Sequence, residues 1–106
     1  MNIFTKEEIA NQLDIKVRTL HYYHHIAKDY VEDFEKDYPT INGEPYTRGK
    51  LTLYQVWILR KLVNLGKRFN SRKILPDLIY SDEQAFTKSA YEKENSHVSI
   101  AKYVNI

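Results

Sequence analysis

The chain reads TKEEIANQLDIKVRTLHYY over residues 5–23. The start of this stretch fits a helix capping box, because the Thr5 hydroxyl can accept from the third helical amide while the Glu8 carboxylate reaches back to the Thr5 amide. A first helix is therefore expected over about 6–13. Only residues 14–16 separate it from the next apolar segment, which leaves room for a tight turn. The spacing predicts two helices joined as a helix-turn-helix.

The second helix is expected from Val17 to about His25, and it has two unlike faces. A rotation of 100° per residue places an apolar set on one side, formed by Val17, Leu20, Tyr23 and His24. The opposite side carries Arg18, His21, Tyr22 and His25. This side has hydrogen-bond donors, aromatic edges and no acid, which is what a helix entering a DNA groove requires. An ordinary solvated helix face has the same periodicity, so both interpretations stay open.

Two turns are indicated by residues that tolerate a positive φ. Asp14 stands where helix-turn-helix turns often have glycine, and Asp adopts the left-handed conformation more easily than most residues. The pair Asn42-Gly43 is the strongest two-residue hairpin signal. The return limb of that hairpin would carry Tyr46, Thr47, Arg48, Gly49 and Lys50. A basic limb beside a helix-turn-helix is typical of a winged helix, whose wing holds the phosphate backbone; the alternative is a surface hairpin with incidental cations.

Further helices are expected after the hairpin. Thr52 and Gln55 repeat the capping box, and Gly66 is placed to end a helix of about fourteen residues. A fourth helix is expected from residue 81 to about residue 92, with Pro76 marking a break before it.

The helix that follows Thr52 has more apolar surface than one contact can cover. A core-facing stripe of normal width is formed by Val56, Leu59, Leu62 and Val63. Trp57, Ile58 and Leu65 widen this stripe, and each such side chain contributes ~1.5–3 kcal/mol when buried. Either the rest of the domain covers this helix on two sides or a second copy does. We expect a homodimer, also because DNA-binding domains of this size gain affinity and site length by pairing.

Length and composition indicate a single compact unit. The chain has 106 residues, of which 42% are hydrophobic and 28% charged, as in folded soluble proteins. Residues 1–70 are expected to form a DNA-binding domain and residues 71–106 a helical extension and tail within the same unit. The chain has no Cys, which excludes disulfides, thiolate nucleophiles and Cys-ligated zinc. Since no apolar run reaches the ~20 residues that span a bilayer and residues 1–4 lack the basic start of a signal peptide, we expect a cytoplasmic protein without a membrane partner.

Charge is distributed unevenly along the chain. Residues 1–50 have seven Lys or Arg and nine Asp or Glu, whereas residues 51–106 have nine and five. An acidic stretch over 29–37 favours an alternative function, a small protein-interaction module such as a phage inhibitor of a host protein, if those acids lie beside the second helix. A basic stretch over 60–73 contains no acid. It could follow DNA phosphates, or it could be a solvated helix end that complements the helix dipole.

Residues 17–23, Val-Arg-Thr-Leu-His-Tyr-Tyr, resemble part of the DNA-binding domain of the MerR family of bacterial regulators. In that family an N-terminal helix-turn-helix contains Arg-Thr-(Leu/Ile)-Arg-Tyr-Tyr. Residues 3–13 are similar to the opening helix of the family, and residues 54–66 to its later helix, which ends in an apolar residue followed by Gly. The resemblance covers about residues 3–66 and implies a mainly α fold with a small β-hairpin, a MerR-like winged helix-turn-helix.

The resemblance also implies a function and a set of residues. Arg18 and His21 would lie near base edges or phosphate, and Tyr22 would donate to a phosphate. His21 replaces the usual Arg of the family, Asp14 replaces its usual Gly, and the acidic segment between the second and later helices is longer than a typical wing. We also expect neither the long C-terminal dimerisation helix nor the effector domain of full-length members. The chain therefore resembles the minimal members found as excisionases and as phage or plasmid control proteins.

From these observations we expect a sequence-specific duplex DNA-binding protein, a regulator of transcription, recombination or replication in a bacterium, phage or plasmid. The residues expected to contact DNA are Lys16, Arg18, Thr19, His21, Tyr22, Tyr46, Arg48 and Lys50.

A metal site and an enzyme are not expected. Imidazoles three and four residues apart on a helix can share a cation, but His24 points to the apolar side and leaves His21 and His25 without a further ligand, so no metal or other cofactor is expected. A histidine near phosphate would instead gain charge as the pH falls and strengthen DNA binding. There is no Gly-rich phosphate loop and no activated nucleophile signature. Residues 97–104 alternate imperfectly and could form a strand or a partner-docking tail.

Overall fold

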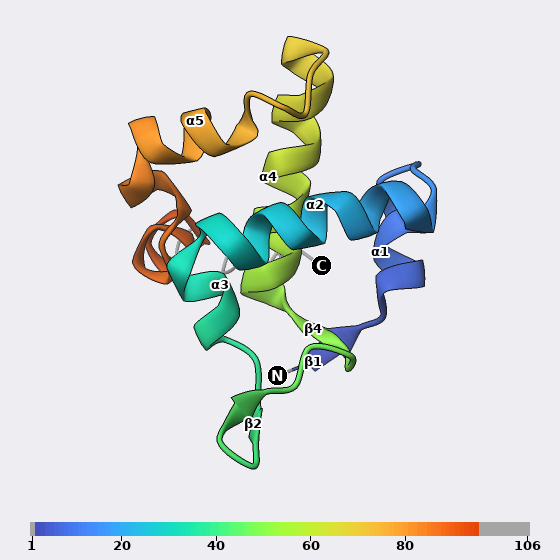
Figure 1. The fold of residues 1–106 in the computed structure, drawn as a ribbon, viewed down its shortest axis with the longest axis vertical. Helices are drawn as coiled ribbons and strands as arrows, with labels where there is room; N and C mark the ends of the chain where they lie inside the picture. Colours follow the sequence, from blue (N-terminus) through green and yellow to red (C-terminus); the bar gives the residue numbers. More distant parts are fainter. Residues whose placement is uncertain (1, 96–106) are drawn as a thin grey trace, which may run out of the picture.

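The computed structural model describes residues 2–95 (Figure 1). Helices dominate, and the strands form two short antiparallel pairs, β1 with β4 and β2 with β3. The elements in chain order are β1 (Asn2–Phe4), α1 (Lys6–Gln12), α2 (Val17–Tyr30), α3 (Glu32–Lys36), β2 (Thr40–Ile41), β3 (Glu44–Pro45), β4 (Leu51–Thr52), α4 (Leu53–Phe69), α5 (Leu75–Ser81) and the 3₁₀ helix η1 (Glu83–Phe86). A further helix covers 88–95. The expectation of a mainly helical protein with a small hairpin is confirmed.

Both predicted capping boxes are present. The Thr5 hydroxyl accepts from the Glu8 N–H at 3.1 Å, and the Glu8 carboxylate accepts from the Thr5 N–H at 2.9 Å. Thr52 and Gln55 form the same pair of bonds at 3.1 and 2.9 Å. Gln55 is also fully buried, and its side-chain amide donates to the Phe34 carbonyl at 3.0 Å. The second capping box therefore connects the start of α4 to α3 as well as capping the N-terminus of α4.

The turn between α1 and α2 has the predicted left-handed residue. Asp14 adopts a φ of 55°, so Asp serves where glycine is common in such turns. The Ile15 N–H returns to the Ala10 carbonyl at 3.0 Å and satisfies one of the last carbonyls of α1. This turn brings α1 to pack against α2.

The second helix, α2, runs past its predicted end near His25. Ile26 and Ala27 are buried and extend the apolar side by another turn. The helix ends at Val31, whose backbone is extended with a φ of −108° and a ψ of 103°. The acidic stretch over 29–37 is therefore divided between two helices: its start completes α2, and most of the rest forms the separate short helix α3.

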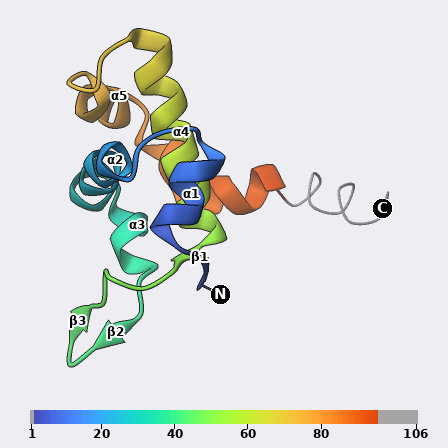
Figure 2. The same cartoon turned by 90° about the vertical axis from the view of Figure 1, so that its right-hand side faces the viewer.

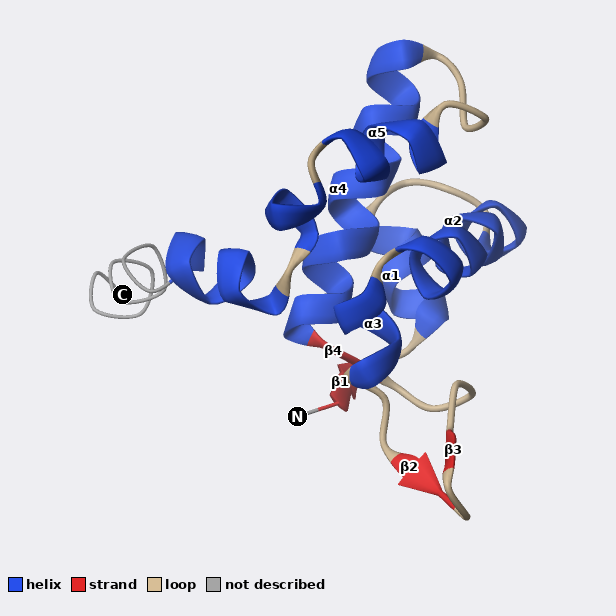
Figure 3. Ribbon diagram, turned by 60° about the vertical axis from the view of Figure 1, so that its left-hand side comes forward, coloured by secondary structure: helices blue, strands red, loops and turns tan. Residues whose placement is uncertain are grey.

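The predicted hairpin is present but short. Asn42 and Gly43 occupy its turn with φ values of 55° and 82°, the left-handed pair that a type I′ turn requires. The Tyr46 N–H closes the base of the hairpin by donating to the Pro39 carbonyl at 2.8 Å. Figure 3 shows β2 and β3 projecting from the helical body, and both strands are exposed. Residues 46–50, predicted as the return limb, form a loop that follows β3.

The long helix α4 crosses the centre of the molecule and supplies much of the core. Its buried residues are Tyr54, Gln55, Val56, Ile58, Leu59, Leu62, Val63 and Gly66. Figure 2 shows α2 and the hairpin on one side of α4 and the helix at 88–95 on the other. The Trp57 ring lies edge-on to the Tyr91 ring of that last helix, with centroids 5.5 Å apart. The chain itself thus buries Ile58 and partly covers Trp57 and Leu65, so the wide apolar stripe argues less for a homodimer, which stays a prediction.

Gly66 does not end α4, and that prediction was wrong. The helix continues to Phe69 and ends at Asn70, which adopts the left-handed conformation with a φ of 51°. A Cβ atom on Gly66 would lie 2.3 Å from the Tyr23 hydroxyl oxygen. Glycine is needed at this position because α2 packs closely across α4, a tertiary contact that helix-end rules do not capture.

The segment after α4 also differs from the single helix predicted over 81–92. Pro76 lies in the first turn of α5, where its missing N–H removes no intrahelical bond, so it helps to begin a helix rather than to break one. The chain turns at Asp82 and again at Thr87, which separates α5, η1 and the helix at 88–95. Within residues 2–95 no helix is both long enough and apolar enough to cross a membrane. The prediction for 97–104 lies outside the described residues.

Candidate nucleic-acid interface

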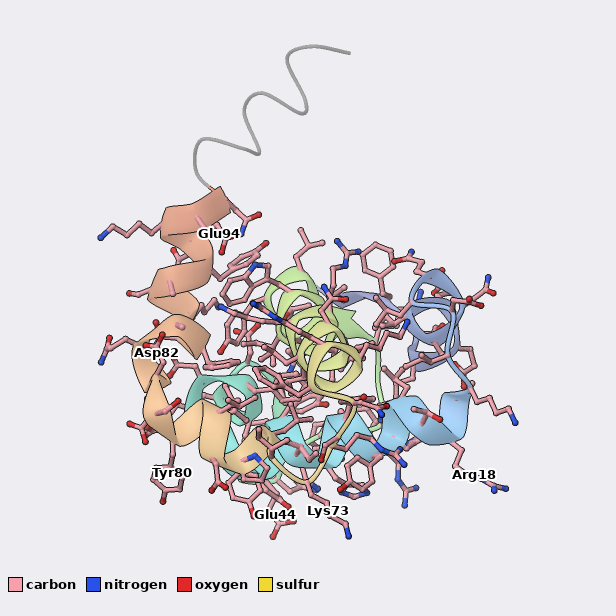
Figure 4. The ribbon with its side chains drawn as sticks, turned by 90° about the horizontal axis from the view of Figure 1, so that it is seen from above. Arg18, Glu44, Lys73, Tyr80, Asp82 and Glu94 are labelled. Carbon is pink, nitrogen blue, oxygen red and sulfur yellow. The ribbon has the colours of Figure 1, made fainter. Side chains whose placement is uncertain are left out.

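Over residues 17–25, the outer face of α2 consists of the four exposed side chains Arg18, His21, Tyr22 and His25. The opposite side is buried through Leu20, Tyr23 and His24, as the rotation of 100° per residue predicts. Thr19 is half-buried at the boundary, and Lys16 is exposed at the N-cap. Residues 17–28 include no acid. Arg18 points away from the body of the protein at one end of the molecule (Figure 4).

His24 belongs to the core and not to a metal site. Its Nε2 atom is hydrogen-bonded to the Tyr38 hydroxyl, and its ring lies edge-on to those of Phe34 and Tyr38. Burial, reinforced by nearby cationic groups of which Lys6 is the strongest, lowers the pKa of His24 from 6.5 to about 3. His24 is therefore neutral at physiological pH. Among residues 2–95, no three His, Cys, Asp or Glu side chains are grouped so that they could hold a metal ion.

The loop at 46–50 lies against the start of α1. The Lys6 ammonium donates to the Thr47 carbonyl at 2.9 Å and fixes the middle of the loop. Arg48 and Lys50 are exposed, and together with His21 they line a shallow depression of about 400 Å³. The structure therefore brings these three predicted DNA-binding residues together along one edge of α2.

Tyr46 is placed differently from the other predicted residues of the loop. Its ring packs over Gly49, where an added Cβ would lie 3.2 Å from the ring, and 42% of its surface stays exposed. It is not among the residues that line the depression beside His21. Tyr46 thus shapes the loop and presents an aromatic ring next to it.

Two further cations on this edge were missed in the sequence. Burial lowers the pKa of Lys6; Glu7 opposes this effect, and the nearby cation of Lys28 reinforces it. Lys28 lies on α2 beyond the predicted helix end near His25, so its place on this edge follows only once α2 is known to continue. The start of α1, by contrast, gives no local sign that Lys6 will meet the loop.

The opposite edge of α2 faces the end of α4 and the turn that leads to α5. The guanidinium carbon of Arg72 lies 4.5 Å from the centroid of the Tyr22 ring. Thr19 and Tyr22 line a second depression, of about 640 Å³, together with Lys67, Arg72 and Lys73. Lys67 also donates to the Leu13 carbonyl at 3.4 Å. The predicted site is therefore flanked by cations on both edges, and the second flank comes from the basic stretch at 60–73.

Not all of that basic stretch contributes to this flank. The Lys61 ammonium lies over the rings of Trp57 and Phe86, at 4.5 and 4.9 Å, and donates to the Ala85 carbonyl at 2.7 Å. Lys61 therefore contributes to the packing between α4 and η1. Arg60 is exposed on α4, and a rotation of 100° per residue turns it away from Gly66 and therefore from α2. The stretch divides into residues that serve the fold and residues that border α2.

The acidic stretch over 29–37 lies mainly beyond the C-terminal end of α2. Asp33 accepts from the Lys88 N–H at 2.9 Å and so caps the helix at 88–95. Asp37 accepts from the Thr52 hydroxyl at 2.5 Å and pairs with the Lys88 ammonium at 2.6 Å. Two of the acids thus hold the fold together through contacts with Thr52 and Lys88.

Asp29 is the acid that shares the outer face of α2. It lies eleven residues after Arg18, which corresponds to about 16 Å along a helix. The acids of the stretch therefore do not lie beside the start of α2, where they would repel a DNA backbone. Asp29 does line a depression with Tyr22, Arg72 and Lys73, so one carboxylate borders the α5 edge of this face.

Together these side chains form what we call the basic strip: Arg18, His21 and Tyr22 at its centre, Arg48 and Lys50 on one edge, and Arg72 and Lys73 on the other. Its chemistry offers charged donors and an imidazole to a ligand with many anionic oxygens, beside the aromatic ring of Tyr22. No protein-family model, no curated protein and no solved structure matches this chain.

Proposed function

We propose that this protein is a winged helix-turn-helix protein, similar to the MerR family, that binds duplex DNA sequence-specifically and regulates transcription, recombination or replication. The observation that supports this most strongly is the basic strip, in which cations from the 46–50 loop and from the α4–α5 turn border an outer helix face without acids over 17–28. Phosphate contacts on both sides of a helix set its position in a groove, while side chains on the helix contact the base edges.

The dimensions of the elements agree with this proposal. A helix with side chains is about 10–12 Å across and enters the major groove of B-DNA, which is about 12 Å wide. In this arrangement Lys16, Arg18 and His21 reach bases or phosphates from the first turns of α2. Arg48 and Lys50 then contact the backbone on one side of the groove, with Tyr46 next to them.

Arg18 provides the sharpest test of sequence recognition. Selection of bound sequences from a random duplex pool should yield a defined motif for the parent protein. Arg18→Ala should weaken binding to that motif by about 1–3 kcal/mol and relax the preference at one position, because a bidentate contact to a base is lost. The control is Arg60→Ala, which removes an exposed arginine from the side of α4 that faces away from α2 and should leave both the motif and the affinity unchanged. Equal behaviour of the two variants would show that α2 does not read the sequence.

Salt dependence tests the role of the loop at 46–50. Each phosphate contact contributes about −0.9 to the slope of log K against log salt for B-DNA. The double variant Arg48→Gln/Lys50→Gln should therefore make the slope shallower by about two and weaken all sequences to a similar extent. The matched control is Arg60→Gln/Arg68→Gln, which removes two exposed arginines that face away from Gly66 and α2. If both double variants change the slope equally, the proposed phosphate contacts of the loop are refuted.

Failure of the parent protein to bind any duplex at low ionic strength would refute the proposal as a whole. The protein-interaction module that the acidic stretch favours would then be the remaining hypothesis. In that case Asp29, Glu32 and Glu35, the exposed acids of the stretch, would be the side chains to substitute first.

A further inference from the structure

Tyr22 and Arg72 form a cation–π pair that connects two elements of the fold. The Arg72 guanidinium carbon lies 4.5 Å from the centroid of the Tyr22 ring, with the ring on α2 and the arginine in the α4–α5 turn. Within residues 2–95, the Arg72 side chain forms no hydrogen bond or ion pair, and its backbone carbonyl accepts from the Leu75 N–H at 3.3 Å. The Tyr22 ring is held in turn by Tyr23, whose centroid is 6.3 Å away at an interplanar angle of 83°.

The geometry of stacking determines what the arginine can still bind. A guanidinium group stacks through its flat face, and its N–H donors point outward in the plane of the group. A distance of 4.5 Å is within the range of about 6 Å over which a cation is attracted to an aromatic ring. The pair therefore restrains the Arg72 side chain, whose N–H groups form no hydrogen bond or ion pair with residues 2–95. Such a restrained fork is suited to two parallel bonds to phosphate oxygens.

We infer that Tyr22 is a positioning residue, whose ring holds Arg72 so that the guanidinium edge binds a DNA phosphate on the α5 side of α2. This inference rests on the proposed function. In this inference the ring of Tyr22 acts by holding Arg72, whereas the MerR resemblance implies that the Tyr22 hydroxyl donates to a phosphate itself. The two roles differ in a testable way, because Phe retains the ring and lacks the hydroxyl.

The test is a double-mutant cycle on a labelled duplex of random sequence, with affinity measured over a range of salt concentrations. Tyr22→Leu should weaken binding about two- to fivefold and make the slope of log K against log salt shallower by about one. Arg72→Gln should make that slope shallower by the same amount. Tyr22→Phe should bind like the parent. In the Arg72→Gln background, Tyr22→Leu should have no further effect. Tyr80→Leu is the matched control, since Tyr80 is 72% exposed at the opposite end of the molecule from Arg18 (Figure 4) and should not affect binding.

The outcomes separate the inference from the function it rests on. If Tyr22→Phe weakens binding as much as Tyr22→Leu, the hydroxyl makes the contact and the inference is wrong. If the effects of Tyr22→Leu and Arg72→Gln simply add, the ring does not act through the arginine, and the inference is again wrong while DNA binding stands. If the parent binds no duplex, the proposed function fails and the inference fails with it. A change of salt slope in Tyr22→Leu that disappears without Arg72 supports it, since a purely structural defect would persist in both backgrounds.

Discussion

The substitution Gly66→Ala should destabilise the parent protein but stabilise a variant in which Tyr23, the residue that faces Gly66, has been replaced. In the interior of α4, replacing Gly by Ala would by itself stabilise the helix by about 1 kcal/mol. The new Cβ, however, would lie 2.3 Å from the Tyr23 hydroxyl oxygen and 3.1 Å from two ring carbons. Tyr23 is only 4% exposed, so its rigid ring has little room to move. Overpacking of this kind costs about 1–3 kcal/mol, and the clash should exceed the gain in helix propensity.

We therefore expect Gly66→Ala to lower the free energy of unfolding by about 1 kcal/mol in the parent protein. In a Tyr23→Leu background the ring is gone, and the same change should raise it by about 1 kcal/mol. Urea denaturation followed by circular dichroism measures all four proteins of this cycle. Asn64→Ala, at an exposed position of the same helix, serves as the control and should stabilise both backgrounds by about 0.5 kcal/mol. A stabilising Gly66→Ala in the parent protein would refute the packing argument.

Two further predictions concern buried polar contacts. Burial lowers the pKa of His24 from 6.5 to about 3, so the unfolded chain takes up the proton at a higher pH than the folded protein does. The contribution of the neutral His24 to the free energy of unfolding is therefore fully present above pH 6.5 and is lost as the pH falls towards 3. Between pH 7 and pH 5 the free energy of unfolding should decrease by at most about 2 kcal/mol. The double variant His24→Phe/Tyr38→Phe should show a flatter stability profile over that interval in urea denaturation, and an equally steep one would contradict the assignment. Thr52→Ala should cost about 2 kcal/mol, since it removes a helix cap and the hydroxyl that donates to Asp37 at 2.5 Å, whereas Thr5→Ala removes only a cap and should cost about 1 kcal/mol. Similar losses in the two threonine variants would mean that the bond to Asp37 contributes nothing.

Features set by a few neighbouring residues could be predicted from the sequence. Both capping boxes and the Asn42-Gly43 turn depend on local bonds and on allowed φ values, and all three are present. The division of α2 into a buried and an exposed face follows from helical rotation alone. Because the candidate site lies on that exposed face, its central residues could be predicted as well.

Features set by contacts between distant segments could not be predicted. The extension of α2 through Ala27 depends on burial against other helices, and Gly66 depends on the ring of Tyr23. The α5 edge of the site exists because the chain turns back after α4 and brings Arg72 to Tyr22, a separation of fifty residues along the sequence. In the same basic stretch Lys61 turns inward to a carbonyl and two rings, and nothing in its immediate neighbours distinguishes it from Arg72.

The loop at 46–50 is fastened at more than one point, and this affects the thermodynamics of any complex it enters. The Tyr46 N–H is bound to Pro39, the Thr47 carbonyl to Lys6, and the strand that follows pairs with β1 at the N-terminus. Ordering a free backbone costs about 1–2 kcal/mol per residue in entropy. For this loop most of that entropy is lost when the protein folds, so a ligand meets a preorganised surface. Loosening the N-terminal strand should therefore weaken binding through entropy alone, although none of its residues need touch the ligand.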